Sequence, residues 1–425
     1  MSAVFDIKEH VIESQHIREY PRATAHSQEE VLHIAIKQYI PKDNPNPQPG
    51  DVTVIGAHAN GFVKELYEPL WEDLLTEARR KGFNIRSIWI ADVAAQGDSG
   101  VLNEHELGND PSWLDHARDL LHMTNVFRAE MPRPLIGIGH SFGANVIVNL
   151  ALMHPRLLSS LVLLDPVLSR FEAQGPWYGF GYMKASAGRR DLWPSRGAAA
   201  EAVMRNRVYA AWDPRAVTAL VTHGFRDTPT ALYPGEQGKT TIKTTKHHEV
   251  FTYYRPVAAR DPRTGRLRPL PRSEAPDADP AELARYPDYP FYRPEGPLTT
   301  DRLPHLRPPV LWVFGETSGV CAPDQRREKM ELTGVGVGGS GGAAAGMVRE
   351  VTVKGCGHLV AMEAPGQVAR HAADFVAPAL GRWRAEQAEY QAWVTGRDDR
   401  AKQTLDEEWV ANIAAVQWPP PKAKL

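Results

Sequence analysis

A serine stands between two glycines in the stretch "GIGHSFGANVIVNL", residues 137–150, where one apolar run ends and another begins. A buried strand followed at once by an apolar helix requires a sharp turn, which leaves no room for side chains two residues before and after its central residue. Gly139 and Gly143 supply that room around His140, Ser141 and Phe142. The pattern predicts a nucleophile elbow with Ser141 as the nucleophile. The simpler interpretation is a small polar residue in a tight turn.

Apolar runs that alternate with helical patterns surround this turn. They cover residues 32–40, 52–61, 85–93, 134–139 and 158–167, and they resume at 308–316 and 349–355, ahead of a helix at about 366–398. Continuous apolar strands separated by helices predict an α/β fold with a mostly parallel sheet covered on both faces. We expect the core in two parts, 1–167 and 306–398, with an inserted lid or cap at 168–305 and a C-terminal tail at 399–425.

The predicted lid is rich in aromatic residues, among them Phe171, Trp177, Tyr178, Phe180, Trp193, Trp212, Phe251, Tyr253 and Tyr254. An aromatic lid over a serine site favours an apolar substrate, although such residues also form the core of a lid. Further along, six arginines between 255 and 272 oppose only Asp261 and Glu274. This segment is compatible with a coenzyme A phosphate partner, and an exposed loop rich in proline and arginine explains it without any ligand.

Charge and cysteine content exclude several classes of function. Lysine plus arginine number 49 against 51 aspartate plus glutamate, a net charge of −2, which argues against a nucleic-acid partner. The two cysteines, Cys321 and Cys356, are typical of a reducing compartment and cannot form a metal set. His247 and His248 are expected in a strand, where neighbours point to opposite faces, so no metal site is predicted. The N-terminus does not resemble a secretory signal, and no apolar stretch reaches the roughly 18 residues of a membrane span.

The backbone around the turn offers donors for a developing oxyanion. The N–H of Phe142 lies at the start of the predicted helix, where the helix dipole favours negative charge. A second donor is expected from the loop "GAHANGF", residues 56–62, through the main chain of Asn60, with His58, Ala59 and Gly61 shaping the bend. The alternative is an ordinary loop whose histidine packs locally.

A general base is expected near the C-terminal end of the sheet. His358 follows the predicted strand 349–355, is flanked by Gly355 and Gly357, and precedes the last helix, which fits the chain order serine, acid, histidine. Asp165, near the end of the predicted strand 158–167, is the favoured acid. Glu316 and Asp324 remain alternatives, since they follow the next strand, and Asp165 could simply cap local N–H groups.

The C-terminus "VQWPPPKAKL" ends in Ala423, Lys424 and Leu425, a relative of the Ser-Lys-Leu peroxisomal address. Three prolines before it keep the tail extended and accessible to an import receptor. We therefore expect a peroxisomal matrix protein that binds this receptor, and a solvated basic tail is the alternative.

These residues resemble the α/β-hydrolase family over roughly residues 10–395, and more closely the fungal peroxisomal lipase-like and host-selective-toxin-biosynthesis hydrolases. The segments that carry the resemblance are "HANGFVKELYEPLWEDLL", "GHSFGAN", "LVLLDPV" and "GHLVAMEAP". The resemblance implies an eight-stranded, mostly parallel sheet and a lid at 168–305. It also implies Ser141 as nucleophile, His358 as base, Asp165 as acid and His58 to Gly61 as oxyanion loop. Ala59 departs from the glycine that is common at its position in the wider family.

A serine at the elbow indicates acyl transfer, because relatives that form alkyl esters use an aspartate there. The sequence thus predicts a serine hydrolase of carboxylic esters, such as lipid esters or lactones, which acts on a small apolar substrate without a cofactor. Two alternatives stay open. One is an acyltransferase or thioesterase in fungal secondary metabolism, and the other is a non-catalytic ligand-binding member of the fold.

Overall fold

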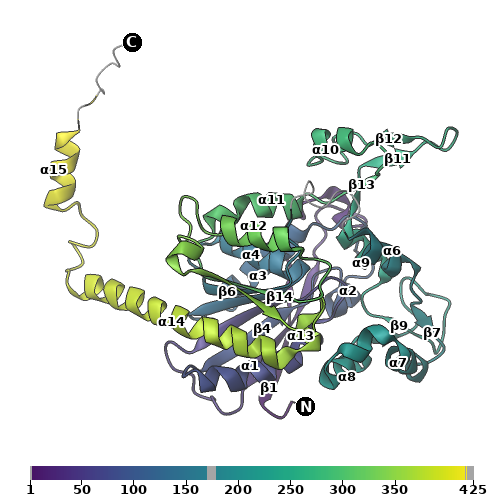
Figure 1. Ribbon diagram of the computed structural model, residues 1–425, viewed down its shortest axis with the longest axis horizontal. Coiled ribbons are helices and arrows are strands. Elements are labelled where there is room, and N and C mark those ends of the chain that lie inside the picture. Colours follow the sequence, from purple (N-terminus) through teal and green to yellow (C-terminus); the bar gives the residue numbers. More distant parts are fainter. Residues whose placement is uncertain (1, 170–178, 417, 419–425) are drawn as a thin grey trace. The chain divides into compact units, whose positions relative to one another are not determined.

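The computed structural model describes residues 2–169, 179–416 and 418, and its centre is one large sheet (Figure 1). The sheet has eight strands in the order β1-β2-β4-β3-β5-β6-β14-β15, and all neighbours run parallel except the pairs β1–β2 and β2–β4. This confirms the predicted eight-stranded, mostly parallel sheet. The strands are β1 (Phe5–Glu13), β2 (His33–Pro41), β3 (Val52–Ala57), β4 (Ile85–Ala91), β5 (Leu135–His140), β6 (Leu158–Leu164), β14 (Val310–Gly315) and β15 (Val348–Val353).

Helices cover both faces of the sheet, which is why its central strands are apolar along their whole length. On one face lie α3 (Trp113–Val126), α4 (Phe142–Met153), α11 (Glu295–Arg302) and α12 (Pro323–Leu332); on the other lie α1 (Glu68–Arg80) and the first turns of α14 (Pro365–Thr395) (Figure 1). Every residue of β3, β5 and β14 is buried, and Trp89 and Trp312 are fully enclosed. The hydrophobic core therefore lies between the sheet and the helices on its two faces.

We call the chain between β6 and α11 the insertion, and within its described residues no strand joins the main sheet. It contains the helices α6 (Phe180–Gly188), α7 (Arg196–Arg205), α8 (Pro214–His223), α9 (Lys246–Tyr253) and α10 (Pro280–Arg285). Its short strands are β7 (Leu192–Trp193), β8 (Phe225–Asp227), β9 (Thr240–Ile242), β10 (Arg255–Pro256), β11 (Ala258–Arg260), β12 (Leu267–Pro269) and β13 (Phe291–Tyr292). The lid boundaries 168 and 305, like those of the other predicted segments, stay predictions.

The expectation that His247 and His248 lie in a strand is wrong, because both belong to helix α9. The side chain of Thr245 accepts the N–H of His248 and so caps the helix, which favours helix over strand at this point. The pattern "KHHEVFTY" has too few apolar residues for its period to decide between the two.

Residues 1–377 form one compact unit and residues 378–425 a second, which carries the end of α14 and α15 (Glu407–Ala415). Among the described residues, no helix combines the length and the apolar character that crossing a membrane requires.

Candidate active site

The turn between β5 and α4 has the conformation that its glycines predict. Ser141 has φ 57° and ψ −116°, a strained region for a residue with a side chain. A Cβ atom on Gly139 would lie 2.4 Å from the carbonyl oxygen of Gly143, and one on Gly143 would lie 2.2 Å from that of Ala57. Both positions therefore exclude every residue except glycine, and the close packing raises the Ser141 side chain clear of the backbone.

Three side chains from separate parts of the chain form one hydrogen-bonded row. The Oγ of Ser141 is 2.8 Å from Nε2 of His358, and Nδ1 of His358 is 2.6 Å from Oδ2 of Asp165. Ser141 follows β5, Asp165 follows β6, and His358 lies in the loop after β15. Because the carboxyl ends of parallel strands meet at one edge of the sheet, residues more than 190 positions apart come together here.

The buried carboxylate of Asp165 is held from three sides. Besides His358, it accepts the N–H of Gly315 at 3.1 Å and the hydroxyl of Ser318 at 2.5 Å. Three donors fix the position of this carboxylate, and its bond to Nδ1 orients the imidazole of His358. Ser318 has no sequence signal, since its partner lies 153 residues away.

The two alternative acids lie elsewhere. Glu316 accepts the backbone N–H of Gly355 at 2.8 Å, and Asp324 is exposed in the first turn of α12. Neither has a contact with His358 among the interactions of the described residues.

Glu363, at the end of the short helix α13 (Val360–Glu363), holds the loop that carries His358. Its carboxylate accepts the N–H of Gly357 at 2.6 Å and that of Leu359 at 3.3 Å, the residues on either side of the histidine. This clamp fixes the backbone of His358. The sequence analysis missed it, although an acidic residue five positions after a flanked histidine is a local signal that could have indicated it.

The loop after β3 places Asn60 beside the elbow. Ala59, Asn60, Ser141, Phe142 and His358 all line one cavity. Among the described residues, the backbone N–H groups of Asn60 and Phe142 have no hydrogen-bond partner, whereas Ala59 donates its N–H to the Tyr67 hydroxyl and Gly61 donates to Gln96. Two unused donors at the cavity wall are what a developing oxyanion requires.

His58 supports this loop from within the core. Its Nε2 accepts the N–H of Val93 at 3.0 Å, so Nδ1 carries the proton and donates to the carbonyl of Ala59 at 2.8 Å. Burial lowers the pKa of His58, which keeps the ring neutral. His58 therefore braces the bend and does not reach the cavity.

Gln96 connects the loop to the insertion. Its carbonyl oxygen accepts the N–H of Gly61 at 2.8 Å, while its amide donates to Oδ1 of Asn60 at 2.8 Å and to the hydroxyl of Thr252 at 3.1 Å. Asn60 in turn donates from its side chain to the carbonyl of Glu249. Thr252 and Glu249 belong to α9, so a helix of the insertion holds Asn60 in place.

His140 links the elbow to the loops on both sides. The Tyr67 hydroxyl accepts the N–H of Ala59 and donates to Nδ1 of His140 at 2.8 Å, and Nε2–H of His140 donates to the carbonyl of His358 at 2.9 Å. Burial, with a contribution from the neighbouring His358, lowers the pKa of His140 to about 3. The ring is therefore neutral, with one tautomer fixed by its two partners.

This neutral histidine makes stability depend on pH. The unfolded chain takes up a proton at His140 below about pH 6.5, and the folded protein does not until about pH 3, so His140 lowers the free energy of unfolding as the pH falls through this window. Between pH 7.5 and 5.5 the wild type should lose about 1.4 kcal/mol more than a His140→Gln variant. Urea denaturation at both pH values measures the difference, and equal losses would contradict it.

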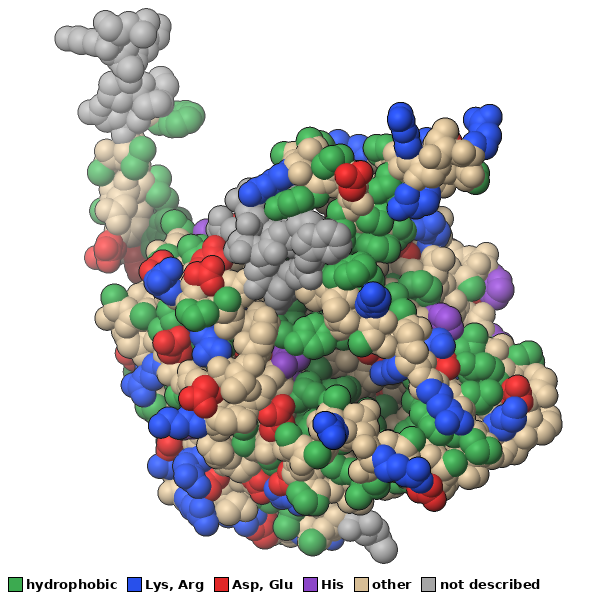
Figure 2. All heavy atoms as spheres, turned by 45° about the vertical axis from the view of Figure 1, so that its right-hand side comes forward, with side chains coloured by type: hydrophobic (Ala, Val, Ile, Leu, Met, Phe, Trp, Pro, Cys, Tyr) green, Lys and Arg blue, Asp and Glu red, His purple; other side chains and the backbone are tan. Residues whose placement is uncertain are grey.

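The row opens into a cavity of about 460 Å³, a size that suits a small organic ligand. Its wall is mainly apolar and includes the aromatic residues Phe62, Trp113, Phe142, Tyr182, Tyr209, Trp212, Tyr253 and Tyr254. Figure 2 shows a hollow in this face of the molecule with hydrophobic side chains around it. Of the aromatic residues singled out in the sequence, Trp212, Tyr253 and Tyr254 contribute to the wall, while Phe171, Trp177 and Tyr178 lie outside the described residues.

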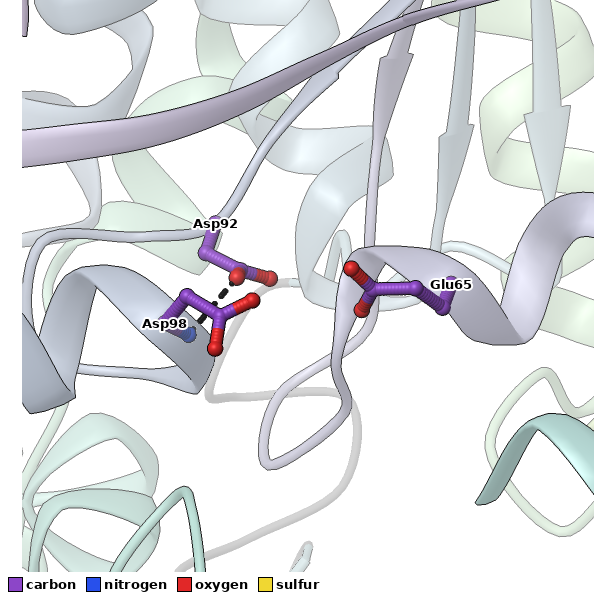
Figure 3. Close-up of side chains that lie close together, drawn as sticks. All are labelled: Glu65, Asp92 and Asp98. Atoms are coloured by element: carbon purple, nitrogen blue, oxygen red, sulfur yellow. Dashed lines mark hydrogen bonds between the residues drawn. The ribbon is translucent and has the colours of Figure 1, made fainter. Parts of the chain in front are cut away.

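A cluster of three carboxylates, Glu65, Asp92 and Asp98, lies near the loop of Asn60 (Figure 3). The ammonium of Lys64 sits among them, 2.7 Å from Asp92, 2.7 Å from Asp98 and 3.0 Å from Glu65. Although burial acts in the opposite direction, Lys64 and Lys243 lower the pKa of Asp98 to about 2. Three lysines offset the three carboxylates, since Lys37 also pairs with Glu65 and Lys243 with Asp98. The cluster ties the start of the helix after the loop to the end of β4.

Comparison with known proteins agrees with this fold. The model of the "Alpha/beta hydrolase family" matches residues 54–371. The type I acyl-CoA thioesterase mpaH of Penicillium brevicompactum is 44% identical over 95% of this chain and 94% of that protein, and its namesake in Penicillium roqueforti is 41% identical over 96% and 95%. An abhydrolase domain-containing protein of Alternaria alternata is 28% identical over 30% of this chain and 46% of that protein.

A peroxisomal alpha-beta-hydrolase of Saccharomyces cerevisiae shares the fold, with a TM-score of 0.66 and 14% identity over 97% of this chain and 96% of that one. Both the match of the family model and the identity to full-length relatives cover most of the sequence. This chain belongs to the alpha/beta hydrolase family.

Proposed function

We propose that this protein hydrolyses acyl-coenzyme A thioesters through an acyl-enzyme on Ser141. The observation that carries the proposal is the row from Ser141 through His358 to Asp165, which ends in an apolar cavity. The Penicillium relatives, named acyl-CoA thioesterases and 41–44% identical over nearly the whole chain, support a thioester over the carboxylic ester that the sequence alone favoured.

In the proposed reaction, Nε2 of His358 takes the proton of Ser141 as Oγ attacks the thioester carbonyl. Asp165 stabilises the resulting imidazolium through Nδ1–H, and the N–H groups of Phe142 and Asn60 donate to the oxyanion. The C–S bond breaks, and the thiolate leaves with the proton of His358. Water then attacks the acyl-enzyme with His358 as base, releasing the acid and restoring Ser141.

A matched series of substrates tests this function. One acyl group is presented as its coenzyme A thioester and as an oxygen ester, and kcat/KM is measured for each with Ser141→Ala as the background. We expect the thioester to be favoured at least about tenfold, since a thiol is a better leaving group than an alcohol. Equal rates, or a preference for the ester, would return the assignment to carboxylic-ester hydrolysis.

Two further readouts separate the remaining alternatives. An added amine or alcohol that captured most of the acyl group in place of water would indicate an acyltransferase. A fluorophosphonate that failed to label the wild type would favour the non-catalytic ligand-binding member of the fold.

The peroxisomal location is also a proposal. Ala423, Lys424 and Leu425 lie outside the described residues, and the location is supported by their resemblance to a peroxisomal address. A fluorescent protein that carries the decapeptide "VQWPPPKAKL" should concentrate in peroxisomes, while a version without the last three residues should stay diffuse. Imaging in a fungal cell with a peroxisomal marker checks this, and an identical distribution of both versions would refute the address.

A further inference from the structure

A hairpin of the insertion rises from the rim of the cavity. Strands β10 and β13 pair at its base, and β11 and β12 pair beyond them. Tyr254, directly before β10, and Arg293, directly after β13, both line the cavity that contains Ser141. The chain therefore leaves the cavity wall, forms the hairpin and returns to the wall.

The stretch from residue 260 to residue 272 of this hairpin contains five exposed arginines. We call residues 258–272 the arginine hairpin; it carries Arg260, Arg263, Arg266, Arg268 and Arg272. Figure 2 shows Lys and Arg side chains gathered on the projection that carries β11 and β12. Among the described residues, none of the five forms an ion pair with a carboxylate. In a chain whose net charge is −2, this is a local concentration of positive charge.

Within the described part of the chain, the two acidic residues nearest in sequence form no ion pair with the arginines of the hairpin. Asp261 accepts the backbone N–H groups of Arg263 and Thr264 at 2.8 and 2.9 Å and so closes the turn. Glu274 lies 3.7 Å from Arg22, outside the hairpin. Both carboxylates thus have other partners, and the guanidinium groups of Arg263, Arg266 and Arg272 have none among the described residues.

Arg255, at the base, shows the contrast between a structural arginine and these five. It is 2% exposed, pairs with Asp110 at 2.6 Å and Asp277 at 2.8 Å, and stacks 3.4 Å from the centre of the Tyr20 ring. This buried arginine anchors the hairpin to the core. Packing accounts for Arg255, and Arg260 donates to the carbonyl of Gly265 within the hairpin. The side chains of Arg263, Arg266, Arg268 and Arg272 form no hydrogen bond among the described residues.

We infer that the arginine hairpin binds the phosphate groups of coenzyme A while the acyl group occupies the cavity. The inference rests on the proposed function and names the part of the substrate that the cavity does not hold. A guanidinium offers a planar pair of donors that matches a phosphate, and several of them on one hairpin suit a ligand with more than one phosphate. The pantetheine chain separates these phosphates from the thioester, as the hairpin is separated from Ser141.

The spacing along the chain is consistent with this placement. Five residues lie between Tyr254 at the cavity wall and Arg260, so the two Cα atoms are at most ~20 Å apart along an extended chain. An anionic membrane would also attract arginines, but its phosphates have no connection to the cavity. A ligand that carries its thioester and its phosphates on one chain explains why the hairpin begins and ends at cavity-lining residues.

The test compares two thioesters of the same acyl group, one of coenzyme A and one of N-acetylcysteamine, which lacks the phosphates. The variant is Arg263→Gln, Arg266→Gln and Arg268→Gln combined in the full-length chain. The control variant removes the same charge from exposed positions outside the insertion, by Arg327→Gln, Arg349→Gln and Arg370→Gln. Both variants are assayed at low and high salt, because screening weakens exposed charge contacts.

We expect the hairpin variant to raise KM for the coenzyme A thioester about tenfold and to lose the salt dependence of the wild type. Its KM for the N-acetylcysteamine thioester and the behaviour of the control should not change. An equal effect on both thioesters would mean that the hairpin supports the cavity and would overturn the inference, as would an unchanged KM for coenzyme A.

Binding of free coenzyme A by calorimetry separates this inference from the proposed function. If the wild type cleaves neither thioester, the proposed function fails, and a tenfold weaker affinity of the hairpin variant would still support the phosphate site. Equal affinities would overturn it. Binding to vesicles of anionic lipid that depends on the three arginines, with no measurable affinity for coenzyme A, would assign the hairpin to a membrane instead.

Discussion

A Ser141→Ala variant is expected to lose about 10⁴- to 10⁶-fold in kcat for thioester hydrolysis while it remains folded. The alanine removes only the Oγ atom that lies 2.8 Å from His358, and the strained backbone of the turn is unchanged. Steady-state assays with an acyl-coenzyme A substrate measure the loss, and thermal denaturation verifies that the variant is folded.

Labelling gives a second measure of the same prediction. A fluorophosphonate should label the wild type and leave Ser141→Ala unlabelled, because the probe reacts with the activated hydroxyl. A variant that retained more than about a hundredth of the wild-type kcat would show that another group attacks the substrate.

The second large effect concerns the acid. Asp165→Asn is expected to lower kcat by about 10³- to 10⁴-fold, because an amide donates to Nδ1 of His358 or leaves it unpaired and so favours the wrong tautomer. The asparagine amide has nearly the same shape as the aspartate carboxylate, so the loss of kcat would reflect charge and proton position more than packing.

Glu316→Gln is the matched control. It makes the same chemical change at the next strand end, where the carboxylate contacts Gly355 and not His358. Its kcat should stay within about threefold of wild type. A loss with Glu316→Gln that equalled the loss with Asp165→Asn would contradict the assignment of the acid.

The fold could be predicted because its signals are local and strong. Apolar runs such as Val52–Ala57 and Val310–Gly315 are too continuous for half-exposed strands and too short for helices, which indicates a buried parallel sheet. The turn at Ser141 added a second constraint through its two glycines. The insertion lacks such signals, and helix α9 was wrongly expected as a strand because its few apolar residues define no period.

In the candidate site, too, some residues could be predicted from the sequence and others could not. Ser141, His358 and Asp165 each stand next to a strand end that the sequence marks, so the topology alone predicts that they meet. The residues that hold them could not be found in this way. Ser318, Gln96 and Tyr67 act through hydrogen bonds to partners that include residues remote in sequence. An isolated polar residue carries no sequence pattern that distinguishes such a role.

The contacts of Gln96 bear on how substrate enters. Its amide joins Asn60 to Thr252, so the cap helix and the proposed oxyanion donor form one polar assembly before any ligand arrives. If the insertion moved away from the core as a rigid body, the hydrogen bonds that hold Asn60 would break. We therefore expect turnover with α9 in place, on dissolved monomeric substrates and without the lag or the lipid–water interface that flap-opening lipases require.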